Sequence, residues 1–214
     1  IATECINITG NTVIDALLEV NQKIESDVAL KSSISKQFPF LDKTKRLVLV
    51  TAHRRENFGA GFESICNAIS AISKRNDVQI VYPVHLNPSV QEPVYRILGN
   101  NPNVHLIAPQ DYLPFIFLMS SSYIILTDSG GIQEEAPSLG KPVLVLRDNT
   151  ERPEAVHAGT VILVGTEEDK IVKSVENLLD NIDFYNQMSV ASNPYGDGNA
   201  AKRIVATLFK EGKD

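Results

Sequence analysis

Short apolar runs alternate along the chain with longer segments in which apolar residues recur at helical spacing. The runs are rich in β-branched residues and read LVLVT, VQIVYPV, VHLIAP, YIILT, PVLVL and TVILV, at 47–51, 78–84, 104–109, 123–127, 142–146 and 160–164. Most are nearly continuous rather than alternating, which is typical of strands buried on both faces of a parallel sheet.

Helical periodicity marks the segments between and around these runs. We expect helices at 11–24, 62–75, 90–99, 114–121, after Gly131, at 168–182 and at 200–212. The repeated order of strand then helix predicts an α/β fold, a Rossmann-like doubly wound parallel sheet. The polar stretch DKTKR, at 42–46, is expected to connect an N-terminal helical segment to the first strand.

Composition narrows the class of protein without changing this picture. Hydrophobic residues make up 43% and charged residues 21% of 214 residues, as in ordinary globular proteins with one large or two small domains. The formal net charge of −6 argues against nucleic acid as the main partner, although a local basic site is compatible with it.

Cysteine use and hydropathy favour a reduced cytoplasmic protein. Cys5 and Cys66 lie far apart without metal-ligand spacing, so we expect no metal site from them. No apolar run approaches the roughly 18 residues that span a bilayer, so no membrane partner is expected. The first residues, IATECINITGN, lack the pattern of a signal peptide and do not start with Met, which suggests a fragment or a processed product.

Ligands of open parallel sheets bind beyond the carboxyl ends of the strands, so the loops there carry the candidate chemistry. The first loop is TAHRRENFGAG, at 51–61, and places His53, Arg54 and Arg55 directly after a strand. Two guanidinium groups suit a phosphate, and a nearby imidazole can donate or shuttle a proton. A solvated charged loop punctuated by glycines is the plainer interpretation.

Two further loops add basic groups at the same edge. PVHLNP, at 83–88, places His85 between two prolines, where a structural histidine is the simpler interpretation. RDNTERPEAVHAG, at 147–159, supplies Arg147 and Arg152 with glutamates beside Arg152, and a salt-bridged surface loop explains it equally well. Taken together, these loops favour an anionic small molecule on a protein of net negative charge.

The loop TDSGGIQEEAPSLGKP, at 127–142, is the strongest candidate for a phosphate site. Gly130 and Gly131 let a ligand approach the backbone closely, Ser129 adds a hydroxyl, and free N–H groups at a helix start attract anions. Glu135 lies one turn after Gly131, where its carboxylate can accept hydrogen bonds from a ribose, and Glu134 should point elsewhere. An ordinary helix cap with acids in the first turn is the alternative. Because of Pro137, we expect the helix to start irregularly.

These segments, in this order, resemble a known family. TAHRREN, PVHLNP, DSGGIQEEAPSLGKPVLVLRD, TERPEAV, AGT and NPYGDG look like the C-terminal half of the bacterial non-hydrolysing UDP-N-acetylglucosamine 2-epimerases, and the match covers nearly the whole chain. The resemblance implies that the sheet is the C-terminal domain of a two-domain GT-B architecture, with the active site in the cleft between two Rossmann-like domains.

The resemblance implies inversion at carbon 2 of UDP-GlcNAc, which yields UDP-ManNAc. In the family, UDP is eliminated to leave 2-acetamidoglucal and adds back after a proton returns on the opposite face. No cofactor and no metal are implied. The partners are UDP and UDP-GlcNAc, and the full-length enzyme is expected to be a cytoplasmic homodimer that serves cell-surface polysaccharide biosynthesis.

Residue roles carried over by motif divide into three groups. His53 matches the catalytic histidine, near the sugar and phosphate. Arg54 and His85 match positions that contact a second, regulatory UDP-GlcNAc. The residues implied for UDP are Phe115 at the uracil, Ser129, Gly130 and Gly131 at the diphosphate, Glu135 at the ribose and Arg152 at phosphate.

The resemblance also divides the chain. It implies an interdomain crossover and helix at 1–25, a Rossmann-like UDP-binding domain at 26–192 and a C-terminal helix at 193–214. The family's essential carboxylates belong to an N-terminal domain that precedes this sequence. We therefore expect residues 1–214 alone to bind UDP without epimerising it.

Three alternatives stay open. A GT-B glycosyltransferase would use the same UDP site and pass the sugar to an acceptor, which a product assay without acceptor would reveal. A hydrolysing epimerase would release free ManNAc and UDP. A nucleotide-sugar-binding module would bind UDP with no reaction, and titration with UDP would separate it from a purely structural domain.

Overall fold

The computed structural model describes residues 2–211 and contains a six-stranded, all-parallel sheet with the order β3-β2-β1-β4-β5-β6. The strands are β1 (Arg46–Thr51), β2 (Val78–Pro83), β3 (Val104–Ile107), β4 (Ile124–Thr127), β5 (Val143–Val145) and β6 (Val161–Leu163). All six predicted strands are present, and the order is that of a doubly wound sheet whose direction reverses between β1 and β4.

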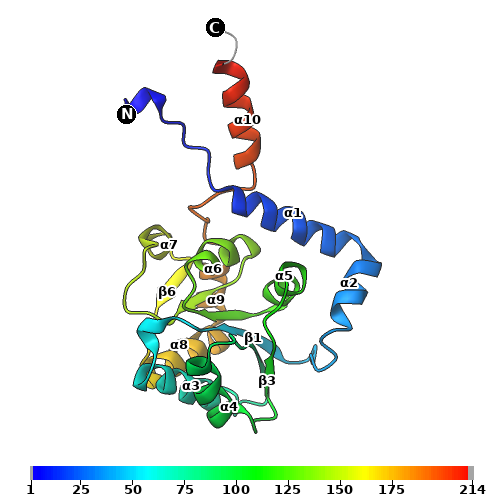
Figure 1. Ribbon diagram of the computed structural model, residues 1–214, viewed down its shortest axis with the longest axis vertical. Coiled ribbons are helices and arrows are strands. Elements are labelled where there is room, and N and C mark those ends of the chain that lie inside the picture. The colour runs from blue at the N-terminus through cyan, green and yellow to red at the C-terminus, as the bar shows by residue number, and fades with distance from the viewer. Residues whose placement is uncertain (1, 212–214) are drawn as a thin grey trace.

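Helices cover both faces of the sheet (Figure 1). The α-helices are α1 (Thr12–Ser26), α2 (Val28–Ser35), α3 (Ala60–Ile72), α4 (Pro88–Leu98), α5 (Tyr112–Ser121), α6 (Gly130–Glu135), α7 (Pro153–His157), α8 (Glu168–Asp180), α9 (Ile182–Ser189) and α10 (Ala200–Glu211). The short 3-10 helices are η1 (Thr3–Cys5), η2 (Arg55–Asn57) and η3 (Ala136–Leu139). Among residues 2–211, none of these helices combines the length and the apolar character needed to cross a bilayer.

Alternate side chains of each strand enter two separate cores. Val48 and Val50 pack with α3, α4 and α8, whereas Leu47 and Leu49 pack with α1, α2 and α5. This explains why the strand sequences are continuously apolar: both faces are buried, so neither alternate position tolerates a charge.

Helix boundaries follow local capping. The single helix predicted over 168–182 is wrong in detail, because α8 ends at Asp180 and α9 begins at Ile182. The side chain of Asn181 accepts a hydrogen bond from the N–H of Phe184 and so starts a new helix. The irregular start expected from Pro137 is also wrong: α6 begins regularly at Gly130 and changes to 3-10 geometry only at Ala136.

The two ends of the chain leave the sheet body side by side. The N–H of Asn11 donates to the carbonyl of Tyr195 over 2.8 Å, and the Asp15 carboxylate accepts from the N–H groups of Ala200 and Ala201. Residues 2–10 and α10 project from this point, next to α1 (Figure 1). Exposed apolar side chains mark both projections: Ile6, Ile8, Val205, Leu208 and Phe209.

Candidate functional site

The candidate site lies at the reversal point of the sheet, where the loops after β1 and β4 meet. The strands pair in register from Val48 and Ile124 to Thr51 and Thr127, and the hydroxyls of the two threonines are 2.7 Å apart. The loop with His53 and the loop with Gly130 therefore leave the sheet from adjacent positions, as the sequence predicts.

A buried aspartate ties these two loops together. Asp128 is fully buried, and its Oδ2 accepts hydrogen bonds from the backbone N–H groups of His53 and Arg54, each over 2.8 Å. Asn57 donates to the same oxygen over 3.4 Å and to the carbonyl of Leu146 over 3.1 Å. No role for Asp128 is predicted from the sequence, since a lone acid after a strand carries no signal of its own.

Two guanidinium groups face the open side of Gly130. A methyl group placed on Gly130 would lie 3.8 Å from Nη2 of Arg54 and 3.8 Å from Nη2 of Arg152. Within residues 2–211, neither Nη2 atom donates a hydrogen bond to the protein, although the Nη1 of Arg54 lies 3.6 Å from a carboxylate oxygen of Glu151. These two Nη2 groups are thus available to bind an anion over the backbone of Gly130.

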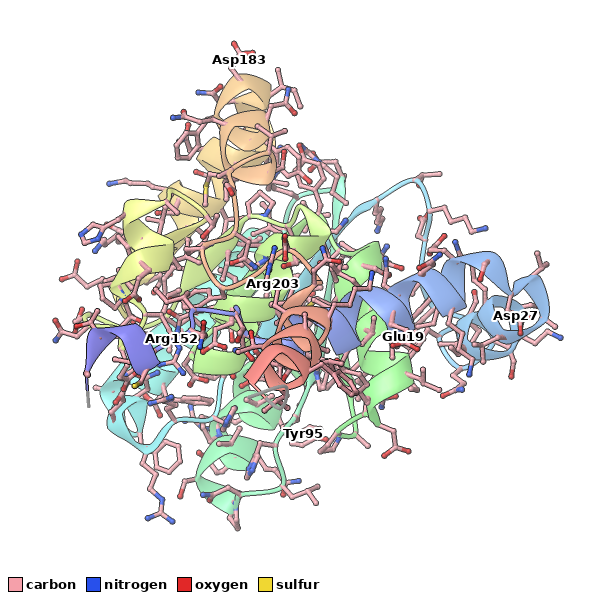
Figure 2. The ribbon with its side chains drawn as sticks, turned by 90° about the horizontal axis from the view of Figure 1, so that it is seen from above. Glu19, Asp27, Tyr95, Arg152, Asp183 and Arg203 are labelled. Carbon is pink, nitrogen blue, oxygen red and sulfur yellow. The ribbon has the colours of Figure 1, made fainter. Side chains whose placement is uncertain are left out.

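Glu134, the residue before the predicted ribose acceptor Glu135, orients the side chain of Arg152. Glu134 is mostly buried, forms an ion pair with Nε of Arg152 and accepts a hydrogen bond from Asn11 over 2.6 Å. The hydrogen bond that Arg152 donates to Glu134 raises the pKa of the Arg152 guanidinium. Figure 2, viewed from above, shows Arg152 inside the outline of the molecule, with Asp27 and Asp183 at its far tips.

Glu135 is the last residue of α6 and is half-buried. Burial raises the pKa of its carboxyl, and the charge of Glu134 raises it further. Tyr112, on the first turn of α5, is close enough that Glu135 contributes to the raised pKa of its hydroxyl, after burial. A desolvated carboxylate without a cation partner is well suited to accept hydrogen bonds from hydroxyl groups of a ligand.

The helix that carries this carboxylate, α6, starts without a cap from the side chain of its N-cap residue. Ser129 is the N-cap of α6, and its side chain makes no capping hydrogen bond, although its own N–H donates to the hydroxyl of Thr127 over 3.0 Å. The ordinary capping arrangement that competed with the phosphate interpretation is therefore not formed by Ser129.

His53 and His85 lie together beside this corner. Their rings stack with centroids 5.2 Å apart and an angle of 12° between planes. Nδ1 of His85 accepts from the N–H of Asn87 over 3.1 Å, so this ring also has the structural partner that the sequence analysis considered. Nδ1 of His53 lies 3.6 Å from Oδ1 of Asp128.

Two other residues singled out from the sequence, Arg147 and Phe115, have different surroundings. Arg147 is mostly buried, and its guanidinium pairs with Glu56 and Glu151, so it belongs to the salt-bridged loop that was one of the two alternatives. Phe115 lies on α5, partly buried against the core that also contains Ile132 and Ala136, and it is not among the groups gathered around Gly130.

Gly59 shapes the loop that carries His53. It has a φ of +85° at the N-cap of α3, a backbone conformation that residues other than glycine rarely adopt. The backbone therefore turns sharply between η2 and α3, as the glycines of this loop led us to expect.

The comparisons with known proteins agree with this arrangement. A family model described as UDP-N-acetylglucosamine 2-epimerase matches residues 1–209. A protein of Escherichia coli K12 named UDP-N-acetylglucosamine 2-epimerase is 60% identical over 209 residues, which are 97% of this chain and 56% of that protein. The chain therefore spans about half the length of the curated relatives it matches.

Solved structures give the same result. The crystal structure of UDP-GlcNAc 2-epimerase from Neisseria meningitidis bound to UDP-GlcNAc has a TM-score of 0.92 and 52% identity, covering 98% of this chain and 57% of that one. The enzyme of Methanocaldococcus jannaschii in complex with UDP-GlcNAc and UDP has a TM-score of 0.78 and 32% identity, covering 98% of this chain and 56% of that one.

Proposed function

Because the chain belongs to the UDP-N-acetylglucosamine 2-epimerase family, we propose that it supplies the UDP-binding half of an enzyme that interconverts UDP-GlcNAc and UDP-ManNAc. The observation that carries the proposal is the pair of guanidinium Nη2 groups over Gly130 that, within residues 2–211, donate no hydrogen bond, at the edge of the sheet where parallel α/β proteins bind ligands. Two such groups match the charge and the spread of oxygens of a diphosphate.

Each residue then has a task in holding UDP. Arg152 and Arg54 bind diphosphate oxygens over Gly130 and Gly131, and the hydroxyl of Ser129 adds a donor. Glu135 accepts hydrogen bonds from the ribose, and Phe115 packs near the uracil. We keep the assignment of Arg54, with His85, to a regulatory UDP-GlcNAc that the family resemblance implies: Arg54 follows His53 in the chain, and the His53 ring stacks on His85.

The chemistry requires the bond between carbon 1 and the diphosphate to break. UDP leaves as carbon 2 loses its proton, which gives 2-acetamidoglucal, and UDP adds back after a proton returns to the other face. Fixed cationic donors stabilise the charge that develops on the departing diphosphate. His53, beside the same corner, is placed to exchange a proton near the sugar and phosphate.

The remainder of the protein completes the reaction in this proposal. We assign the carboxylates that handle the carbon 2 proton to a second domain, with 1–25 as crossover, 26–192 as the UDP-binding domain and 193–214 as a terminal helix. The relatives are nearly twice as long as the match, and exposed apolar side chains on residues 2–10 and α10 offer a surface to such a domain. We further propose a cytoplasmic homodimer that needs neither metal nor nicotinamide.

The named relatives favour the epimerase over its alternatives. At 60% identity the curated protein is an epimerase, with neither hydrolysis nor glycosyl transfer in its name. In the full-length protein, conversion of UDP-GlcNAc without acceptor and without free ManNAc would separate the epimerase from both rivals.

Calorimetric titration of residues 1–214 with UDP tests the binding part of the proposal. We expect binding in the wild type and a loss of about 1–3 kcal/mol, roughly 5- to 150-fold in Kd, in Glu135→Ala, because a charged hydrogen-bond acceptor for the ribose is removed. Ser129→Ala should cost less, since backbone donors remain.

The matched control is Glu176→Ala, which removes an exposed glutamate on α8, on the opposite face of the sheet. Its affinity for UDP should equal that of the wild type. Equal affinity in Glu135→Ala would remove Glu135 from the site, and absence of any heat with wild-type protein would contradict UDP binding by this half.

A further inference from the structure

Asp128 stands on a rigid support at the end of β4. Its N–H donates to the carbonyl of Thr51 over 3.1 Å, and the hydroxyls of Thr51 and Thr127 join the two strand ends just before it. Its carboxylate is fully buried. The position of this side chain is therefore set by the sheet itself rather than by a loop.

One oxygen of this carboxylate, Oδ2, is fully used in holding the two loops together. Oδ2 accepts from two backbone N–H groups, those of His53 and Arg54, and from the amide of Asn57. These three donors all require an acceptor at the Oδ2 position. They hold the loop after β1 against the loop after β4.

The other oxygen has no such partner. Oδ1 is buried, and within residues 2–211 it accepts no hydrogen bond. The basic group beside it is Nδ1 of His53, at 3.6 Å, which is an ion-pair distance longer than a hydrogen bond. Because the His53 side chain is 42% exposed, the ring has room to rotate and close this gap.

The rest of the imidazole is also constrained. One face of the His53 ring stacks on His85, and the carbonyl of Ala52, directly before it, accepts from the hydroxyl of the buried Tyr82 over 2.5 Å. The ring thus stacks on His85 through one face and has Nδ1 on the side of Asp128, which leaves Nε2 on its other edge.

We propose that Asp128 is a positioning residue for His53: Oδ1 accepts the hydrogen of Nδ1, which selects the tautomer with an unprotonated Nε2. That nitrogen is then the one that exchanges a proton with the bound sugar nucleotide, a role that rests on the proposed function. Buried aspartates select the tautomer of a catalytic histidine in this way in unrelated enzymes. A merely structural Asp128 would act through Oδ2 alone and would leave the tautomer of His53 unselected.

Asp128→Asn separates these two roles, because the three N–H donors determine how the new amide lies. They need the carbonyl oxygen of the asparagine at the Oδ2 position, so its NH₂ group takes the place of Oδ1. The NH₂ group then faces Nδ1 of His53, which must become an acceptor. The substitution keeps the loop in place and inverts the tautomer.

The measurement is the pair of imidazole ¹⁵N chemical shifts of His53 in residues 1–214, recorded in alkaline solution at a pH above which the shifts no longer change, so that they report the tautomer. We expect hydrogen on Nδ1 in the wild type and on Nε2 in Asp128→Asn. His53→Gln assigns the resonances, and Glu176→Gln, which makes the same acid-to-amide change at an exposed site on α8, should leave the wild-type pattern.

Each other outcome overturns the proposal. Hydrogen on Nε2 in the wild type, or an equal mixture of tautomers, excludes selection by Asp128, and this result stands even if Asp128→Asn fails to fold. An unchanged tautomer in a folded Asp128→Asn excludes it as well. The proposed function fails separately: UDP titration of the wild type reports on binding, whereas the tautomer is read without UDP. In Asp128→Asn, UDP affinity within about twofold of the wild type shows that the loop is intact.

Discussion

Two pairs of arginines, at different places on the sheet, show what separates a structural cation from a binding one. Arg46 and Arg75 lie near the amino end of β1, whereas Arg54 and Arg152 lie in the loops beyond the carboxyl ends of β1 and β5. Both pairs have acidic neighbours, and none of the four side chains is fully exposed. Sequence spacing and burial alone do not distinguish them.

The first pair, Arg46 and Arg75, is closed: its guanidinium groups are bound by acceptors of the protein. Nε, Nη1 and Nη2 of Arg75 all donate to Asp77 or Asp180, over 2.7–3.0 Å. Arg46 pairs with Asp77 and with the carbonyl of Leu179, and its guanidinium lies 5.4 Å from the centre of the Tyr123 ring. No nitrogen of Arg75 is left for a ligand, so this cluster joins elements of the fold.

The second pair is open. Nε of Arg152 is held by Glu134, yet its Nη2 and that of Arg54 point at a glycine backbone instead of an acid. A cation is therefore available for binding when one part of its fork is anchored and another part is unsatisfied. The acid that anchors it decides its direction, and the glycine leaves space for the anion.

The largest expected change in UDP affinity comes from replacing both arginines of the open pair. The double variant Arg54→Ala/Arg152→Ala removes two charged donors, each worth about 1.5–3 kcal/mol, so UDP affinity should fall by at least about 100-fold in calorimetric titration. Arg75→Ala, from the closed pair, should leave the affinity unchanged and lower the melting temperature. If Arg75→Ala weakened UDP binding as much, the distinction between the two pairs would be wrong.

A smaller effect follows from changing the acid that anchors each pair. Glu134→Gln replaces one hydrogen-bond acceptor of Arg152 and Asn11 by a donor, and the poorly oriented Arg152 should lower UDP affinity by about 1 kcal/mol, roughly fivefold. Asp77→Asn should instead lower the free energy of unfolding by at most about 1 kcal/mol, since Asp77 is 44% exposed, without any change in affinity. Unaltered UDP binding in Glu134→Gln would show that Arg152 needs no orienting acid.

The smallest effect concerns pH and Glu151. Hydrogen bonds from Arg147, helped by the charge of Arg54, lower the pKa of this exposed carboxyl from 4.5 to about 2. A depressed folded-state pKa means that the ion pairs stabilise the fold above pH 4.5 and that this contribution is lost as the pH falls from 4.5 to about 2. Melting temperatures of wild type and Glu151→Gln should therefore converge over that window. A constant difference between them down to pH 2 would contradict the shift.

The sequence predicted the sheet and its functional edge because both depend on local patterns. Continuous β-branched runs report burial on two faces, and parallel strands separated by helices place every carboxyl end at one edge. The meeting of the loops with His53 and Gly130 followed from that geometry alone. The residues implied by the family resemblance remain predictions until a ligand is bound.

What the sequence did not predict depends on partners far apart in the chain. Glu134 joins Asn11 to Arg152, and Asp128 joins two loops through backbone donors, which no spacing of residue types reveals. Arg147 and Arg152 have similar sequence surroundings, yet one is saturated by Glu56 and the other faces the glycine. The division between α8 and α9 depended on a single capping asparagine within a continuous helical pattern.

The hydrogen bond between Asn11 and Tyr195 determines how the segment between them could be inserted into another protein. Because the incoming and outgoing segments touch, residues 11–195 form a loop whose two ends are already adjacent. Segments of this kind tolerate transplantation into a foreign chain, since a host needs to bridge only a short gap. We therefore expect residues 11–195, with the loops around Gly130, to keep their fold when inserted into a host chain, because the insertion strains none of the six strands.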